Sequence, residues 1–181
     1  MANKKRIITF MTIVVCVFLG SCNPERDENS PLSILFFADL PMDYTEKLEQ
    51  YIESDVAGMV EAEVSFQAQP VFAEKLLLEM VAGEGDIYIV DETLVNTIFD
   101  PVGLVALDDL VDTEEEREAA KPYLDYADEN ATEKQLFAIP LDEESQLLKQ
   151  LELDQPPNMI AVILKRSPHV DESLTILKSL M

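Results

Sequence analysis

The sequence has few of the residues that most catalytic and metal sites require. It contains two cysteines, one histidine, five glycines and no tryptophan among 181 residues. Both cysteines, Cys16 and Cys22, lie within the first 22 residues, so the rest of the chain has no thiol for a disulfide, a zinc site or a nucleophile. The single histidine, His169, has Ser167 nearby, but there is no Gly-x-Ser-x-Gly segment and no phosphate-binding glycine loop. We therefore expect no enzymatic activity, no cofactor and no metal.

Positive charge is also scarce, with 13 Lys and Arg residues against 36 Asp and Glu residues. Three of the bases lie in the first six residues and every acid lies beyond Cys22, so the formal charge of residues 22–181 is −26, against −23 for the whole chain. Such a surface repels nucleic acid and anionic lipid head groups, so neither is expected as a partner. The seven acids between Asp108 and Glu118 lack the Asp-x-Asp-x-Asp-Gly spacing of a calcium loop, and they predict a solvated face instead.

The first 22 residues have the pattern of a leader peptide. Basic residues 4–6 precede an apolar run, Ile7 to Leu19, that is shorter than the roughly 20 residues needed to span a bilayer. The run ends in Leu19-Gly20-Ser21-Cys22, which resembles the lipobox of bacterial lipoproteins. The resemblance implies that residues 1–21 are removed, that Cys22 is acylated, and that its acyl chains hold the protein on the extracytoplasmic face of the cell membrane. An ordinary secretory peptide or a signal anchor is the alternative.

The remaining chain divides into a short spacer and one domain. Asn23 to Pro31 is polar and bounded by prolines, which predicts a flexible tether over residues 22–31. Residues 32–181 are numerous enough for a single domain with its own core.

The clearest structural signal is the stretch from Glu74 to Asp91, which predicts a helix, a glycine turn and a buried strand. Gly83 ends the helix because glycine readily takes the left-handed conformation, and Ile87 to Val90 is a short apolar run typical of a strand. A helix that leads directly into a strand is the second half of a βαβ crossover, which favours a parallel sheet. The apolar stripe of this helix comprises Ala73, Leu76, Leu77, Met80 and Val81.

Other strands and helices alternate along the chain. Asp91 is placed to cap a short helix, and Thr113 with Glu116 predicts a capping box. The predicted strands cover residues 32–38, 60–68, 87–90, 135–140 and 159–164, and the predicted helices include residues 44–52, 114–120, 142–153 and 170–181. This order predicts an α/β domain with three layers and a mostly parallel sheet.

Several segments resemble the N-terminal lobe of the extracellular solute-binding proteins of ABC importers, the type II periplasmic binding proteins. They are Glu74–Ile87, Phe99, Gly103–Val111, Leu136–Pro140 and Met159–Leu180. The resemblance implies a domain that binds a sugar or similar solute and delivers it to an ABC permease. Here Gly85-Asp86 lacks the proline of the family's turn, Ala138 replaces the family's glycine, and no tryptophan is present to stack on a sugar ring. The chain also has no room for a second lobe, so we predict a single lobe.

Candidate ligand-binding residues follow from the predicted sheet, because ligands meet the carboxyl ends of parallel strands. Those ends supply Asp39, Asp91, Glu92 and Asp142, and Tyr44 lies just beyond the first turn. Structural roles are open to the same residues: Asp91 can cap a helix, Asp39 can hold a turn, and Tyr44 can pack in the core.

Two functions remain open from the sequence. The first is a lipid-anchored ligand-binding or accessory component of an ABC import system. The second is an envelope protein that keeps the fold without binding a small molecule and presents its acidic surface to another protein. The turn motifs favour the first function, and the short chain favours the second.

Overall fold

The first strand of the fold, β1 (Leu32–Phe37), is buried at all six positions. The computed structural model describes residues 26–153 and 156–181, so the predicted leader 1–21 and Cys22 lie outside the described residues. The sequence Leu-Ser-Ile-Leu-Phe-Phe suits a strand covered on both faces, because it has no polar face to leave to water. Both faces of this strand are therefore covered by other parts of the domain.

Five strands form the main sheet: β1, β2 (Val64–Gln69), β3 (Ile87–Asp91), β6 (Ile139–Leu141) and β7 (Met159–Ile163). Their order is β2-β1-β3-β7-β6. β1 pairs in parallel with β2 on one side and with β3 on the other. β2 is the edge strand and is only half-buried, as its alternating sequence predicts.

The sheet is mixed, which corrects the prediction of a mostly parallel sheet at its last strand. β7 runs antiparallel to both β3 and β6. The reason lies in the connection from β6 to β7, where the helix predicted over 142–153 is reduced to α6 (Gln146–Lys149). At about 1.5 Å per residue, a helix of four residues cannot carry the chain back along the sheet. β7 therefore begins at the same edge where β6 ends.

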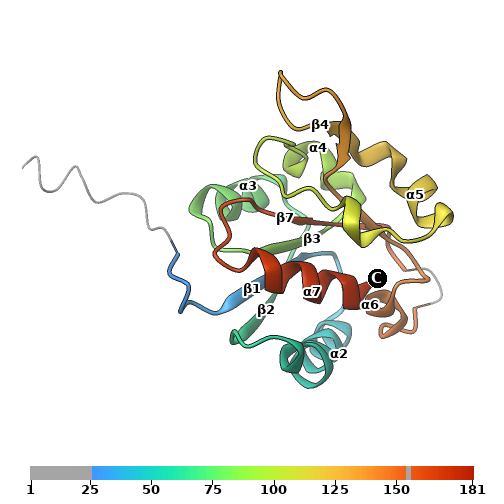
Figure 1. The fold of residues 1–181 in the computed structure, drawn as a ribbon. Helices are drawn as coiled ribbons and strands as arrows, with labels where there is room; N and C mark the ends of the chain where they lie inside the picture. The colour runs from blue at the N-terminus through green and yellow to red at the C-terminus, as the bar shows by residue number, and fades with distance from the viewer. Residues whose placement is uncertain (1–25, 154–155) are drawn as a thin grey trace, which may run out of the picture.

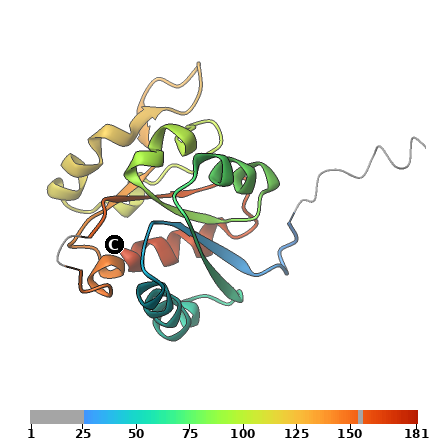
Figure 2. The same ribbon diagram turned by 180° about the vertical axis from the view of Figure 1, so that it is seen from behind.

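Helices cover both faces of the sheet, as a three-layer α/β domain requires. α7 (Val170–Leu180) and α6 lie on one face, whereas α3 (Ala73–Ala82) and α4 (Val95–Ile98) lie on the other (Figures 1 and 2). Two further helices are α2 (Met42–Tyr51) and α5 (Glu114–Ala120). Between the layers, Phe36, Tyr88 and Leu177 are fully buried.

α3 is the helix predicted within the stretch from Glu74 to Asp91, but the face that it packs against the domain is narrower than predicted. Leu76 is the buried residue of this helix. Leu77 and Val81, which were expected to pack in the same stripe, are 52% and 70% exposed, and Leu78 beside them is 66% exposed. The helix contacts the core through one row of side chains, Ala73, Leu76 and Met80, of which Leu76 is fully buried. A second apolar face is left exposed.

The turn from α3 into β3 depends on both of its glycines. Gly83 adopts the left-handed conformation predicted for it, with φ of 75°. A Cβ on Gly85 would lie 2.7 Å from the ring of Tyr88 and 2.9 Å from Leu35. The second glycine is therefore required by close packing and not by a left-handed backbone.

The structure confirms two predicted helix starts and adds a hairpin that the sequence analysis did not predict. The Asp91 side chain caps the turn that follows β3, and the Thr113–Glu116 capping box opens α5. The predicted strands and helices leave out residues 125–134, which belong to a hairpin between β4 (Leu124–Tyr126) and β5 (Lys134–Leu136). The strand predicted over 135–140 is divided between β5 and β6, because the chain passes from the hairpin into the main sheet at this point.

Candidate functional site

The carboxyl ends of β1 and β3 flank the point where the chain changes direction across the sheet. The chain passes from β1 to β2 on one side and then crosses to β3 on the other side of β1. In open sheets of this kind, ligands bind in the crevice beyond the carboxyl ends of the strands at such a switch point. Asp39 follows β1 and Asp91 ends β3, so both predicted residues lie at this position.

Asp39 and Asp91 line one hollow, which we call the β1/β3 hollow. Its volume is about 460 Å³, within the roughly 300–1,000 Å³ typical of small-molecule sites. Five apolar residues make up most of the wall. The whole lining, acidic residues included, is supplied by four separate segments of the chain. The lining residues are Asp39, Leu40, Pro41, Val71, Asp91, Thr93, Leu153 and Pro157.

One oxygen of each carboxylate holds a backbone amide, which for Asp39 belongs to the segment after β2 and for Asp91 to its own turn. Asp39 Oδ1 accepts a hydrogen bond from the Val71 amide at 3.3 Å. Asp91 Oδ1 accepts from the Thr93 amide at 2.9 Å and from the Thr93 hydroxyl at 2.5 Å. The Oδ2 atom of each residue accepts no hydrogen bond from the described residues. The hollow therefore combines apolar walls with two acceptor oxygens, which suits a ligand that donates hydrogen bonds or carries positive charge.

Glu92 lies next to Asp91 but is engaged in other contacts. Its Oε1 accepts a hydrogen bond from the Tyr123 hydroxyl at 3.1 Å, and its Oε2 accepts one from the side-chain amide of Asn158 at 3.4 Å. Burial, together with this bond to Glu92, raises the pKa of Tyr123 to about 12. Glu92 thus joins the loop after β3 to the hairpin segment, and it is not part of the hollow's lining.

Asp142 and Tyr44 lie away from the β1/β3 hollow. Asp142 follows β6, accepts a hydrogen bond from the Glu144 amide at 2.9 Å, and lines a separate hollow with Glu115 and Glu116. Tyr44 is half-buried against the core, and the Lys47 ammonium lies 5.3 Å from the centroid of its ring. The structure thus brings together two of the five predicted residues.

The sequence analysis missed the other walls of the β1/β3 hollow. Val71 follows the carboxyl end of β2, so the rule that selected Asp39 also selects this segment. Pro157 lies there because β7 begins at this edge, and that follows only from the reversed direction of β7.

Residues 26–153 and 156–181 offer no candidate for a metal site or for a membrane-spanning helix. There, no three His, Cys, Asp or Glu side chains converge to hold a metal ion. No helix in the same part of the chain is both long and apolar enough to cross a bilayer.

The geometry defines an α/β domain with an open, partly acidic hollow at its topological switch point.

The chain is 28% identical over 177 residues to a protein of Bacillus subtilis (strain 168) named "Putative lipoprotein YteS". The alignment covers 97% of this chain and 96% of that relative. No protein-family model matches the chain, and no solved structure matches it.

Proposed function

We propose that this protein is a lipid-anchored extracytoplasmic binding protein, related to one lobe of the solute-binding proteins of ABC importers. The observation that carries the proposal is the β1/β3 hollow, where Asp39 and Asp91 stand on either side of the switch point. We assign it to binding and not to catalysis, because among the described residues the two carboxylates are the only titratable groups in its lining, and the Thr93 hydroxyl beside them is engaged with Asp91.

The lining favours a polyhydroxylated solute such as a sugar. Hydroxyl groups donate well to carboxylate oxygens, and the carbon faces of a sugar ring pack on apolar walls such as Leu40, Val71 and Pro157. A small cation is the second ligand class that two carboxylates accept. The solute would pass to an ABC permease or to another envelope protein.

Two observations support the lipid anchor. The Leu19-Gly20-Ser21-Cys22 segment has the residues of a lipobox, and the relative that aligns over nearly the whole chain is named as a lipoprotein. Replacement of the acylated residue, Cys22→Ser, should release the protein from the membrane or block removal of the leader. Unchanged membrane retention and unchanged maturation of this variant would refute the anchor.

Solute binding is tested by thermal unfolding of the soluble Cys22→Ser protein against a panel of sugars, oligopeptides and cations. A solute at a hundred times its dissociation constant should stabilise the protein by about 2.7 kcal/mol and raise its melting temperature visibly. Asp39→Asn and Asp91→Asn should abolish this shift. Asp142→Asn, a matched acid in a different hollow, should leave it unchanged.

A flat response across the panel would favour the alternative function. In that case the domain would serve as an interaction module of the cell envelope, and its acidic surface would contact a membrane protein. Capture of a membrane partner by the anchored protein, in a form unaffected by Asp39→Asn, would support this alternative.

A further inference from the structure

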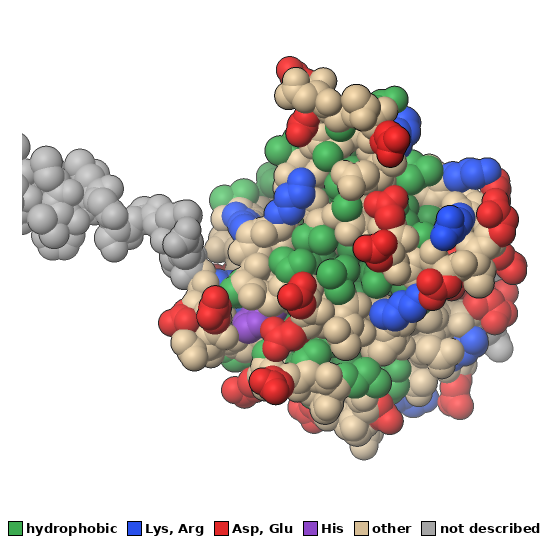
Figure 3. Space-filling model, viewed as in Figure 1, with side chains coloured by type: hydrophobic (Ala, Val, Ile, Leu, Met, Phe, Trp, Pro, Cys, Tyr) green, Lys and Arg blue, Asp and Glu red, His purple; other side chains and the backbone are tan. Residues whose placement is uncertain are grey.

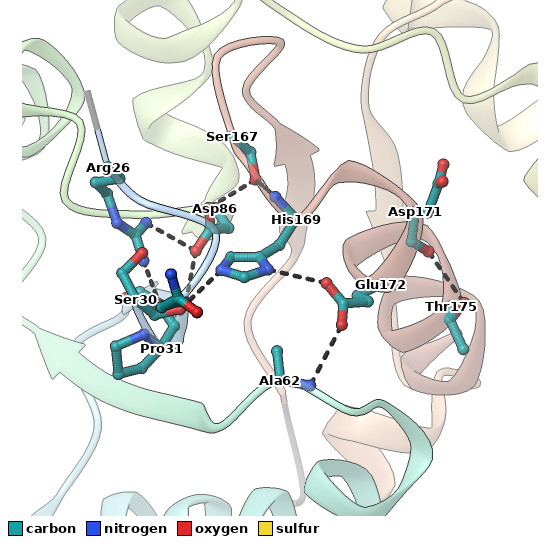
Figure 4. A network of polar contacts seen from close by, with 12 residues as sticks. Arg26, Ser30, Pro31, Ala62, Asp86, Ser167, His169, Asp171, Glu172 and Thr175 are labelled. Carbon is teal, nitrogen blue, oxygen red and sulfur yellow. Dashed lines mark hydrogen bonds and ion pairs between the residues drawn. The ribbon is translucent and has the colours of Figure 1, made fainter.

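The amino-terminal edge of the sheet holds the start of the described chain by a buried ion pair. Asp86, which is fully buried, accepts hydrogen bonds from the Arg26 guanidinium at 2.7 Å, from the Ser33 amide at 2.7 Å and from the Ser167 hydroxyl at 2.6 Å (Figure 4). Arg26 also donates to the Pro31 carbonyl. Residues 26–31, expected as part of a flexible tether, are therefore attached to the domain.

His169 makes a second attachment to the same segment. Its Nε2 lies 2.8 Å from the Ser30 carbonyl, and its Nδ1 lies 2.9 Å from Glu172 Oε2 (Figure 4). Glu172 in turn accepts a hydrogen bond from the Ala62 amide at 3.3 Å. We call the contacts of Arg26 and Ser30 with Asp86 and His169 the clamp.

The clamp leaves a very short leash between lipid and domain. Only three residues, Asn23 to Glu25, lie between Cys22 and Arg26, so four Cα–Cα steps join the two. A chain of four residues spans at most about 14 Å when fully extended. A lipid on Cys22 would therefore keep the clamped edge of the sheet close to the membrane surface, and the rest of the domain could not turn freely around it.

The exposed face of α3 lies at this same edge. Arg166 donates a hydrogen bond to the Val81 carbonyl at 3.4 Å, and its guanidinium packs beside Gly83, three residues before Asp86. Leu77, Leu78 and Val81 form what we call the α3 corner, and all three are more than half exposed. Figure 3 shows hydrophobic and basic side chains beside the point where the grey segment meets the domain, with acidic ones below them.

We propose that the clamp and the short leash hold the α3 corner against the surface of the membrane that carries the lipid. This inference rests on the acylation of Cys22 in the proposed function. Apolar side chains on a helix enter the boundary between head groups and acyl chains by roughly 5–10 Å, and so the corner finds an apolar surface within the reach of its own anchor. The contact depends on apolar burial and not on charge, which agrees with the acidic composition of the chain. The β1/β3 hollow, at the opposite edge of the sheet, then opens away from the bilayer.

The test uses the complete lipoprotein, reconstituted in phosphatidylcholine vesicles that contain a lipid-borne fluorescence quencher. Val81→Cys and Met42→Cys each introduce a labelling site, because the acylated Cys22 has no free thiol. The two positions are matched: both are apolar and exposed, at 70% and 78%, but Met42 follows β1 at the hollow edge. A fluorophore at position 81 should lose most of its emission to the quencher, and one at position 42 should lose little.

Flotation of the vesicles separates the two ways in which the inference can fail. Protein that does not float with the vesicles overturns the lipid anchor, and the orientation with it. Protein that floats but is quenched equally at both positions overturns the orientation alone.

A second variant tests the leash without altering the folded domain. Ten glycine and serine residues inserted between Asn23 and Pro24 lengthen the leash and leave the clamp intact. Quenching at position 81 should then fall to the level seen at position 42. A difference between the positions that survives the insertion would show that the leash does not set the orientation.

Discussion

The two edges of the same sheet use aspartate in opposite ways. At the amino-terminal edge, Asp86 is fully buried and three donors satisfy its carboxylate. At the carboxyl edge, Asp39 uses one oxygen to hold the segment after β2 and Asp91 uses one to hold its own turn, and each leaves the other oxygen to the hollow. The difference teaches that burial and the number of donors, and not residue type, separate an acid that stabilises the fold from an acid that can meet a ligand.

The largest effect should come from removing the buried acid. Asp86→Ala leaves the Ser33 amide without its acceptor and Arg26 without its counter-charge, which should lower the free energy of unfolding by about 3–5 kcal/mol. Urea unfolding measures this loss. Glu84→Ala, two residues earlier and exposed, is the control and should change stability by less than about 0.5 kcal/mol. Equal effects of the two substitutions would contradict the role assigned to the clamp.

A smaller loss is expected from Gly85→Ala at the same edge. The added methyl group would overlap the Tyr88 ring and Leu35 in a core that is already filled, at a cost of about 1–3 kcal/mol. Gly58→Ala is matched to it, since a Cβ on Gly58 meets nothing within 4 Å, and it should be nearly neutral. Thermal melting of both variants decides the point, and a Gly85→Ala protein as stable as the wild type would show that this edge is loosely packed.

Alkaline pH should weaken the amino-terminal edge through Tyr88. Burial raises the pKa of Tyr88 above its ordinary value of 10, and its hydroxyl accepts a hydrogen bond from the Gly85 amide. Below pH 10 the phenol is neutral in both states. Above it the unfolded phenol ionises first, so the free energy of unfolding should fall by about 1.4 kcal/mol at pH 11 from this group.

Comparison of Tyr88→Phe with the wild-type protein isolates this contribution. Urea midpoints on either side of pH 10 should show a steeper fall for the wild type. Tyr123, whose pKa is also raised, contributes a fall of the same sign to both proteins, so it cancels in the difference. Parallel pH profiles would show that Tyr88 ionises no later in the folded state than in the unfolded chain.

The smallest effect on stability is expected at the hollow. Asp39 is exposed and accepts a single long hydrogen bond, so Asp39→Asn should change the free energy of unfolding by less than about 0.5 kcal/mol. The same substitution should abolish the thermal shift produced by a bound solute. A large loss of stability without any effect on binding would reverse the distinction between the two edges.

Local sequence signals predicted the elements that local chemistry determines. The left-handed Gly83, the Asp91 cap and the Thr113–Glu116 capping box each depend on residues within a few positions of one another. The carboxyl-end rule also selected Asp39 and Asp91, because it needs only the direction of parallel strands. It could not separate them from Glu92, since the rule does not say where a side chain points.

Features that depend on distant segments left no local pattern. The clamp joins Arg26 to Asp86 across 60 positions, and neither residue stands out in its own surroundings. Leu77 and Val81 are exposed although their helical spacing suggested burial, because the spacing alone does not say how wide a face the neighbouring elements cover. The direction of β7 was likewise set by the short α6, whose length the charged sequence around it did not reveal.

The reversed β7 also marks a natural place for growth of the molecule. Leu141 and Met159 are paired across the sheet, so the chain between them leaves and returns at adjacent points on the carboxyl edge, and Leu153 and Pro157 of this connection line the β1/β3 hollow. Exposed connections with neighbouring ends accept inserted domains with little disturbance to the parent fold. A domain inserted beside Leu153 or Pro157 would lie next to the hollow that these residues line, and it would add a second wall to it.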